Sequence, residues 1–157
     1  MNDRPVTDAN REAFTQHFSA VFYDFHLFPS LFGVEAAELD ARARKLLHLL
    51  HLESKVRIED GRFSTTELSQ GQRKRLALLT AALEDRPIYV FDEWAADQDP
   101  AFKEIFYHQI LKNLQAAGKT IVVISHDDRY FDVGDRLVKL EDGQIVAQVP
   151  GRRAGVS

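Results

Sequence analysis

Two neighbouring carboxylates, Asp92 and Glu93, directly follow the apolar run 88–91. A short continuous apolar run after a proline, here Pro87, is typical of a strand buried on both faces of a parallel sheet. Open parallel sheets bind their ligands at the carboxyl ends of the strands. The pattern predicts that Asp92 holds Mg²⁺ and that Glu93 polarises an attacking water, as phosphoryl transfer requires. The alternative is a strand that ends in two solvated acids.

A second candidate binding element precedes this strand, at residues 69–72. Ser69 stands just before a helical pattern of apolar residues, where its hydroxyl can cap the helix, and Gly71 allows the backbone to approach a ligand closely. The free N–H groups and the dipole at a helix start suit a phosphate. The alternative is an ordinary capped surface helix with a basic turn at residues 73–75.

A histidine, His126, follows a further apolar run at residues 120–125, which we expect to be a second buried strand. Between the two strands, Asp99 followed by Pro100 predicts a helix start, and the helix should end near Gly118. Strand, helix and strand then form a right-handed βαβ unit. The unit places His126 at the same sheet edge as the two carboxylates, which favours a functional role over simple packing.

The remaining patterns complete an α/β chain. We expect a short helix at 11–18, a buried strand or core-anchored loop at 20–28, an amphipathic helix at 35–52, a small hairpin or irregular link at 56–63 and a hairpin at 136–149. His48 and His51 lie close in sequence, but no third ligand joins them at a suitable spacing, so no metal is assigned to them.

Composition excludes several classes of protein. The chain has 157 residues, 45% hydrophobic and 28% charged, as is ordinary for one globular domain. A formal net charge of −4 argues against a general nucleic-acid binder, although residues 73–75 form a local basic cluster. The absence of cysteine rules out disulfides and thiolate metal sites. No apolar run approaches the length of a membrane span.

The motifs themselves resemble those of a known family. LSQGQ (68–72) and IYVFDE (88–93), in this order and at this spacing, resemble the signature motif and the Walker B strand of the ATP-binding cassette (ABC) ATPases. WAADQDP resembles their D-loop, and His126 matches their switch histidine. The cofactors that the resemblance implies are ATP and Mg²⁺. It implies catalytic roles for Glu93 and His126, a metal ligand in Asp92, and ATP contacts from Ser69, Gln70, Gly71, Gln72 and Asp97.

The aromatic stretch FSAVFYDFHLF (18–28) resembles the cyclic-peptide and siderophore exporter branch of that family. The family usually places Gln where this chain has Tyr23, so the Mg²⁺ and water contact from that position is not expected here. Asp24 and His26 could serve the site, but we assign them structural roles. The resemblance implies two partners, an exporter's transmembrane domain and a second nucleotide-binding domain. It implies no nucleic acid, and a location at the cytoplasmic face of the bacterial inner membrane.

The phosphate-binding motif GxxxxGK[ST] of such ATPases does not occur in these 157 residues. We therefore predict a partial P-loop NTPase core over 1–157: a Q-loop region at 1–34, a helical subdomain with the signature at 35–86, and a Walker B, D-loop and switch-histidine core at 87–157. Such a fragment could come from a truncated gene, a broken reading frame or an excised segment. The strand that should lie beside 120–125 would be missing, leaving an apolar edge, and the chain alone should not hydrolyse ATP.

Two other functions fit parts of the pattern. One is a non-catalytic remnant or binding module that keeps a dimer-facing signature. The other is an ABC-type DNA-repair ATPase, against which the exporter-like stretch 18–28 and the lack of coiled-coil heptads both argue.

Overall fold

A computed structural model describes residues 5–22, 25–27 and 36–151 of the chain. Tyr23 and Asp24 lie outside the described residues. The helices of the first half are α1 (Arg11–Thr15), α2 (Ala36–Leu49) and α3 (Gln70–Glu84), and its strands are β1 (Phe18–Val21), β2 (Ile58–Glu59) and β3 (Arg62–Phe63). The second half contains β4 (Ile88–Asp92), η1 (Trp94–Asp97), α4 (Pro100–Ile105), η2 (Phe106–Ile110), α5 (Leu111–Ala116), β5 (Thr120–Ile124), η3 (Asp128–Val133), β6 (Arg136–Glu141) and β7 (Gln144–Pro150).

The centre of the fold is a parallel sheet in the order β1-β4-β5. β4 pairs in parallel with both neighbours, and Asp92 at its end stands opposite Ile124 of β5. The predicted strand–helix–strand unit is confirmed, because β4 leads through the α4–α5 helix into the adjacent parallel strand β5. The strand expected within 20–28 is β1, which begins earlier, at Phe18, and ends at Val21.

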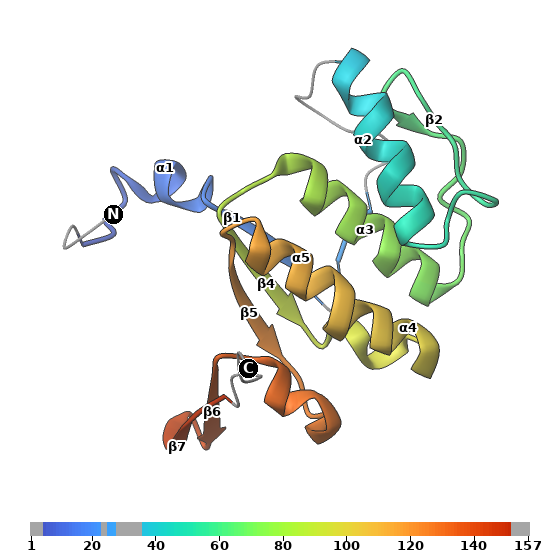
Figure 1. Cartoon of the computed structure of the whole chain (residues 1–157). Coiled ribbons are helices and arrows are strands. Elements are labelled where there is room, and N and C mark those ends of the chain that lie inside the picture. The colour runs from blue at the N-terminus through green and yellow to red at the C-terminus, as the bar shows by residue number, and fades with distance from the viewer. Residues whose placement is uncertain (1–4, 23–24, 28–35, 152–157) are drawn as a thin grey trace.

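α3 and the α4–α5 helix cover one face of this sheet, α2 packs on α3, and α1 projects away from the sheet (Figure 1). A cluster of large aromatic side chains fills the space where the helices meet β4. Phe91, Trp94, Phe102 and Phe106 have at most 1% of their surface exposed, and the Trp94 and Phe106 rings stack with centroids 4.3 Å apart. This cluster fixes the end of β4 against the following helix.

Residues 120–124 do form the predicted strand, β5. The prediction that this strand is buried is wrong. In β5 the side chains of Val122 and Ile124 are 46% and 50% exposed. β4 is the one strand that pairs with β5 in the described part of the chain, so its other edge is open. The open edge agrees with the expectation of an exposed apolar strand edge at this position.

The hairpin predicted at 136–149 is confirmed, and residues 56–63 contain the hairpin instead of the irregular link. Asp60 and Gly61 turn β2 into β3, and Asp142 and Gly143 turn β6 into β7, all four with positive φ angles as a two-residue hairpin turn requires. The β6–β7 hairpin projects from the end of the chain, away from α2 and α3 (Figure 1). Its strand β7 is exposed at every residue, so the hairpin contributes little to the core.

The long helix after Pro100 is confirmed but is not regular. Its middle segment η2 is a π-helix, flanked by the α-helical segments α4 and α5, and a positive φ of 76° at Gly118 follows its end. π-helical turns insert one residue into the helical register. Here the insertion turns Phe106, Tyr107 and Ile110 all into buried positions. Along the described ranges, no helix combines the length and apolar character that crossing a bilayer would require.

Candidate functional site

Glu93 and His126 come together at the carboxyl ends of β4 and β5. His126 Nδ1 lies 2.9 Å from Glu93 Oε2, and the Glu93 amide donates to the Ile124 carbonyl at 3.0 Å. The Glu93 side chain is 29% exposed and that of His126 is 81% exposed. Asp92, half-buried, ends β4 next to them. The sheet therefore gathers the two predicted catalytic groups and the predicted metal ligand at one edge, open to a ligand from solvent.

The backbone at Glu93 is unusual. Its φ of 48° and ψ of 30° lie in the left-handed region, which a residue with a Cβ adopts only when its surroundings hold it there. The turn follows directly from the strand end into the 3₁₀ segment η1. It is this sharp corner that directs the Glu93 carboxylate toward β5 and His126, instead of along the axis of β4.

The start of α3 has the predicted cap. The Ser69 hydroxyl accepts a hydrogen bond from the Gln72 amide at 3.3 Å, and the Gln72 side chain accepts from the Ser69 amide at 3.2 Å. This reciprocal pair is a capping box, which satisfies two of the free N–H groups at a helix start. The side chains of Ser69 and Gln72 are therefore engaged with each other, while the exposed Gln70 is held only by a 3.4 Å contact with Asp97.

Gly71 makes a close approach, but to the chain itself. A Cβ at this position would lie 2.9 Å from the Asp97 carbonyl oxygen, and the Gln98 side-chain amide donates to the Gly71 carbonyl at 3.1 Å. The predicted reason for the glycine was space for a ligand. The structure shows that packing of α3 against η1 already excludes a side chain there.

A buried lysine joins the two groups of site residues, and sequence reasoning missed it. Lys74 has no exposed side-chain surface; its Nζ lies 2.8 Å from Asp97 Oδ2 and donates to the Glu93 carbonyl at 3.1 Å. From the sequence, residues 73–75 are a local basic cluster at the start of a helix, and none of them is assigned to the interior. The missed signal is its position on the helix: Lys74 precedes the buried pair Leu78 and Ala81 by four and seven residues, so it lies on their face.

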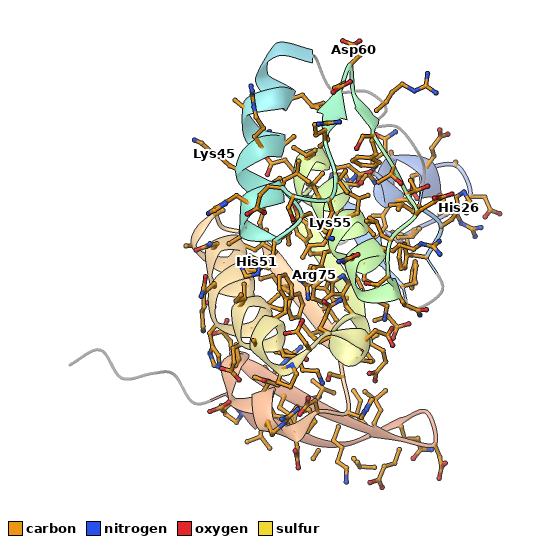
Figure 2. All side chains as sticks on the ribbon, turned by 90° about the vertical axis from the view of Figure 1, so that its right-hand side faces the viewer. His26, Lys45, His51, Lys55, Asp60 and Arg75 are labelled. Atoms are coloured by element: carbon orange, nitrogen blue, oxygen red, sulfur yellow. The ribbon has the colours of Figure 1, made fainter. Side chains whose placement is uncertain are left out.

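The neighbouring Arg75 is also used internally. Its guanidinium lies 3.5 Å from the centre of the Phe102 ring and 2.7 Å from Asp99 Oδ2, and Figure 2 shows it in the middle of the molecule, near His51. The His51 ring packs edge-on against the same Phe102 ring. The Phe102 amide, which donates to Asp99, and next the Arg75 guanidinium hold the pKa of the Asp99 carboxyl below its usual range. Two of the three basic residues are thus unavailable to an outside polyanion.

A second ion-pair cluster fixes the segment after His126. Asp127 accepts from Arg129 at 2.7 Å and from Lys103 of α4 at 3.0 Å. These two contacts, Arg129 first, hold the pKa of the Asp127 carboxyl well below its usual range. Nearby, the hydrogen bond to Glu104 and then burial raise the pKa of Tyr130 to about 12. The chain that carries His126 is therefore anchored on α4 immediately after the histidine.

The carboxylate at the end of β4 suits a metal ion that is bound jointly by the protein and by the phosphates of a nucleotide. Among the residues that the structure describes, no cluster of three or more His, Cys, Asp or Glu side chains could enclose a metal. Mg²⁺, however, is typically bound by one or two carboxylates together with substrate phosphates and water. One half-buried carboxylate at a strand end, that of Asp92, fits this mode.

Two histidines considered from the sequence lie outside this group of residues. His48 Nδ1 lies 3.2 Å from Glu53 Oε1, and His26 is exposed.

Comparison with known sequences agrees with this arrangement. The sequence model of a family described as "ABC transporter" matches residues 1–96, more than half of the chain. The chain belongs to the ABC transporter family. ABC relatives include the ATP-binding protein SyrD of Pseudomonas syringae pv. syringae, 53% identical over 95% of this chain and 28% of the relative. The probable syringafactin export ATP-binding/permease protein SyfD of P. syringae pv. syringae strain B728a is 29% identical over 83% of this chain and 21% of the relative.

The fold comparison points the same way. A dimeric post-hydrolysis structure of the ATP-binding cassette MJ0796, bound to ADP and Pi, superposes with a TM-score of 0.73 at 24% identity, covering 97% of this chain and 70% of that one. At this identity the likeness concerns the fold, and it confirms the predicted α/β ABC architecture. The chain spans 28% of the length of SyrD and 21% of that of SyfD, so only part of such an ABC protein is represented.

Proposed function

We propose that this chain forms the carboxyl-terminal part of the ATP-binding and ATP-hydrolysing domain of a bacterial ABC exporter. The observation that carries the proposal is the 2.9 Å contact between Glu93 and His126 at the ends of adjacent parallel strands, beside Asp92. Family membership supports nucleotide binding in general. The roles of individual residues rest on the geometry of the strand ends and of the α3 start.

In this proposal Glu93 is the general base. Its carboxylate, partly exposed, can accept a hydrogen bond from a water and draw a proton from it as that water attacks the terminal phosphate of ATP. His126 holds the carboxylate from the neighbouring strand, and an Nδ1–H donated to Oε2 would leave Nε2 facing solvent. The imidazole is then placed to contact a phosphate oxygen and to orient the same water.

Asp92 is the proposed ligand of Mg²⁺. The cation, when bound with ATP, would neutralise charge on the phosphate oxygens. The contribution of the chain is one carboxylate held at the end of β4, flanked on both sides by paired strands that keep it in place. Because a single carboxylate is a weak site by itself, we expect Mg²⁺ to bind with the nucleotide and not before it.

The signature group is proposed to act on nucleotide held by a second nucleotide-binding domain. Ser69, Gln70, Gly71 and Gln72 begin α3, where an anion is favoured, and Asp97 lies next to them. The capping box constrains this role, because Ser69 and Gln72 already bond each other; their contacts to a phosphate would come from backbone N–H groups or from opening of the box. The exposed Gln70 is the side chain most available to a partner.

The exported compound is proposed to be a cyclic peptide or siderophore. The name of SyfD, a probable syringafactin export ATP-binding/permease protein, supports an export role, and that of SyrD, an ATP-binding protein, supports ATP binding. The proposed partners are an exporter's transmembrane domain and a second nucleotide-binding domain, and the proposed location is the cytoplasmic face of the bacterial inner membrane. The division into residues 1–34, 35–86 and 87–157 is likewise part of the proposal.

A second candidate is a non-catalytic binding module. The observation that favours it is the intact capped start of α3, whose exposed Gln70 can face a partner. Such a module would complete the ATP site of a partner without turning over ATP itself. The two candidates differ in whether Glu93 matters for hydrolysis.

The test joins the upstream part of the SyrD ATP-binding domain to this chain and measures Mg²⁺-dependent ATP hydrolysis. Glu93→Gln should lower kcat by about 10²–10⁴-fold while ATP still binds, because the variant keeps size and hydrogen bonding but loses the base. Glu59→Gln, an exposed carboxylate on the small hairpin, is the matched control and should leave kcat unchanged. An active chimera whose rate is insensitive to Glu93→Gln contradicts the catalytic assignment.

The binding-module candidate needs its own measurement. The chain is mixed with a SyrD ATP-binding domain in which hydrolysis is blocked, and complex formation with and without Mg²⁺-ATP is followed by size-exclusion chromatography. Gln70→Glu places a like charge where a phosphate is expected and should abolish an ATP-dependent complex. Gly71→Asp would be ambiguous, because its Cβ would meet the Asp97 carbonyl at 2.9 Å and disturb α3 packing directly.

A further inference from the structure

The ammonium group of Lys74 is fully buried between α3 and η1, with no exposed side-chain surface. Burying a lysine charge is unfavourable unless it is paired and hydrogen-bonded. Lys74 meets both conditions: Asp97 Oδ2 is the ion-pair partner at 2.8 Å, and the Glu93 carbonyl is an acceptor at 3.1 Å. The Lys74 ammonium group therefore interacts with Asp97 and with the backbone at Glu93 instead of with solvent.

The carbonyl that Lys74 contacts belongs to the strained residue. Glu93 has its left-handed φ of 48°, and its carbonyl also accepts from the Ala96 amide at 3.2 Å, which closes the first turn of η1. A non-glycine residue keeps such a conformation only when neighbouring contacts hold it. Lys74 and Ala96 are the two donors that fix this carbonyl, one from α3 and one from η1.

Two hydrogen bonds connect α3 with the segment that begins at Glu93, and each side provides one donor. The Lys74 side chain reaches the Glu93 carbonyl, and the Trp94 indole Nε1 donates back to the Lys74 carbonyl at 3.1 Å. Glu93 also connects this network to the end of β5, because its carboxylate lies 2.9 Å from His126 Nδ1. A displacement of α3 is therefore coupled by direct contacts to the direction of the Glu93 side chain.

We propose that Lys74 is a positioning residue for Glu93: it links the helix that carries LSQGQ to the backbone corner that directs the proposed base, and holds Asp97 in the same network. The catalytic consequence rests on the proposed function, whereas the structural link does not. The competing interpretation is that Lys74 only adds stability, like any buried side chain of α3. The two interpretations predict different effects of replacing Lys74: positioning predicts faster exchange at Ala96 alone and a lower kcat, whereas stability predicts faster exchange throughout the fold.

The first test is amide hydrogen exchange in the 157-residue chain. Lys74→Met removes the charge and both contacts while keeping a side chain of similar length. The Ala96 amide should exchange faster by on the order of tenfold, as local opening of η1 becomes easier, while the Leu52 amide, which donates to the Leu47 carbonyl after the end of α2, should not change. Arg73→Met, an exposed neighbour on the same helix, is the matched control and should change neither.

Unchanged exchange at Ala96 overturns the proposal, and so does a parallel increase at Ala96 and Leu52, which would indicate general destabilisation. If circular dichroism shows that Lys74→Met is unfolded, Lys74→Gln is used. Its neutral amide retains a donor with shorter reach and should give an intermediate increase at Ala96. A Lys74→Gln exchange pattern identical to the parent chain would also overturn the proposal.

The second test is kinetic and uses the SyrD chimera. Lys74→Met should lower kcat by about tenfold or more with KM for ATP unchanged, because a misdirected base affects the transition state and not nucleotide binding. Arg73→Met should leave both constants unchanged. A raised KM with constant kcat contradicts positioning. If the parent chimera is inactive, the proposed function fails, and the exchange measurement still decides the role of Lys74.

Discussion

β4 and β5 have similar apolar sequences, IYVFD and TIVVI, and opposite environments. In β4 Tyr89 and Phe91 have at most 1% of their surface exposed, whereas their register partners in β5, Ile121 and Val123, are only partly buried. On the opposite face of β5, Val122 and Ile124 are 46% and 50% exposed. β4 has a parallel partner on each edge, and β5 has a partner on one edge within the described chain. Apolar sequence thus encodes a strand, but its neighbours decide whether that strand is buried.

The two strands are also held by different forces. β4 is fixed by packing, because Phe91 lies edge-on to both Trp94 and Phe106. β5 packs on the core only through the partly buried Ile121 and Val123, and polar contacts hold the segment after its carboxyl end: Asp127 pairs with Lys103 and Arg129, and the Tyr107 hydroxyl lies 3.3 Å from Ser125 Oγ. The expected effects of mutation should therefore differ in kind along the two strands.

The largest effect is expected from Phe91→Ala. Removing a fully buried aromatic ring should lower the free energy of unfolding by about 3–5 kcal/mol, since transfer and cavity terms add. The measurement is urea denaturation followed by circular dichroism. Val122→Ala, on the opposite, exposed face of β5, should cost less than about 1 kcal/mol, because about half of that residue is already in water. Equal losses at the two positions would contradict the comparison.

The next effect is a pH dependence at the end of β5. The folded-state pKa of Asp127 lies below its unfolded value, so its ionised form stabilises the fold above about pH 4. That stability is lost as the pH falls below this value and toward the lower folded-state pKa. Asp127→Asn should therefore weaken the fold at neutral pH and flatten its stability profile below about pH 4. Acid titrations of the parent chain, Asp127→Asn and the exposed control Asp132→Asn measure this; identical acid slopes would rule it out.

A smaller effect should follow from Ser69→Ala, at the polar rim of the buried region. Loss of the capping hydroxyl leaves the Gln72 amide without its side-chain acceptor and should cost about 1 kcal/mol of unfolding free energy. The exposed Ser54, for which the described contacts include no side-chain hydrogen bond, provides the control Ser54→Ala, expected to be neutral. Thermal unfolding of both variants measures the two losses. An unchanged free energy of unfolding for Ser69→Ala would show that the cap does not stabilise the fold.

The smallest stability effect is expected from Val122→Lys on the open strand. A lysine at a half-exposed position should change the unfolding free energy by no more than about 0.5 kcal/mol. It should, however, reduce self-association, because a charge on an edge strand disfavours pairing with another chain. Sedimentation velocity measures association. Val146→Lys on the exposed strand β7 tests whether the effect belongs to β5 or to added charge in general.

Local sequence signals predicted much of the fold. The capping residues Ser69 and Asp99, the turn residues Gly61 and Gly143, and the apolar run of β4 each specify structure through their own chemistry, and each lies as expected. The edge that brings Asp92, Glu93 and His126 together was also predictable, because parallel strands align their carboxyl ends.

What sequence could not provide depends on distant contacts. Val122 and Ile124 are exposed because they lie on the sheet face opposite the one that packs on the core, and the burial of Lys74 reflects a partner 23 positions later, Asp97. Helical spacing alone could have flagged Lys74 as inward-facing, but a lysine within a basic triplet is usually solvated. The π-helix at Phe106–Ile110 was likewise not predicted; it begins at Phe106, whose ring stacks on the distant-in-sequence Trp94.

The left-handed corner at Glu93 sets two selection pressures against each other. Glycine adopts this conformation freely, so Glu93→Gly should relieve backbone strain and offset part of what is lost with the side chain. A library screened only for soluble, folded protein would therefore be expected to enrich glycine at position 93. The same library screened for turnover should return glutamate. The identity of the residue recovered at this one position would report which property the selection rewarded.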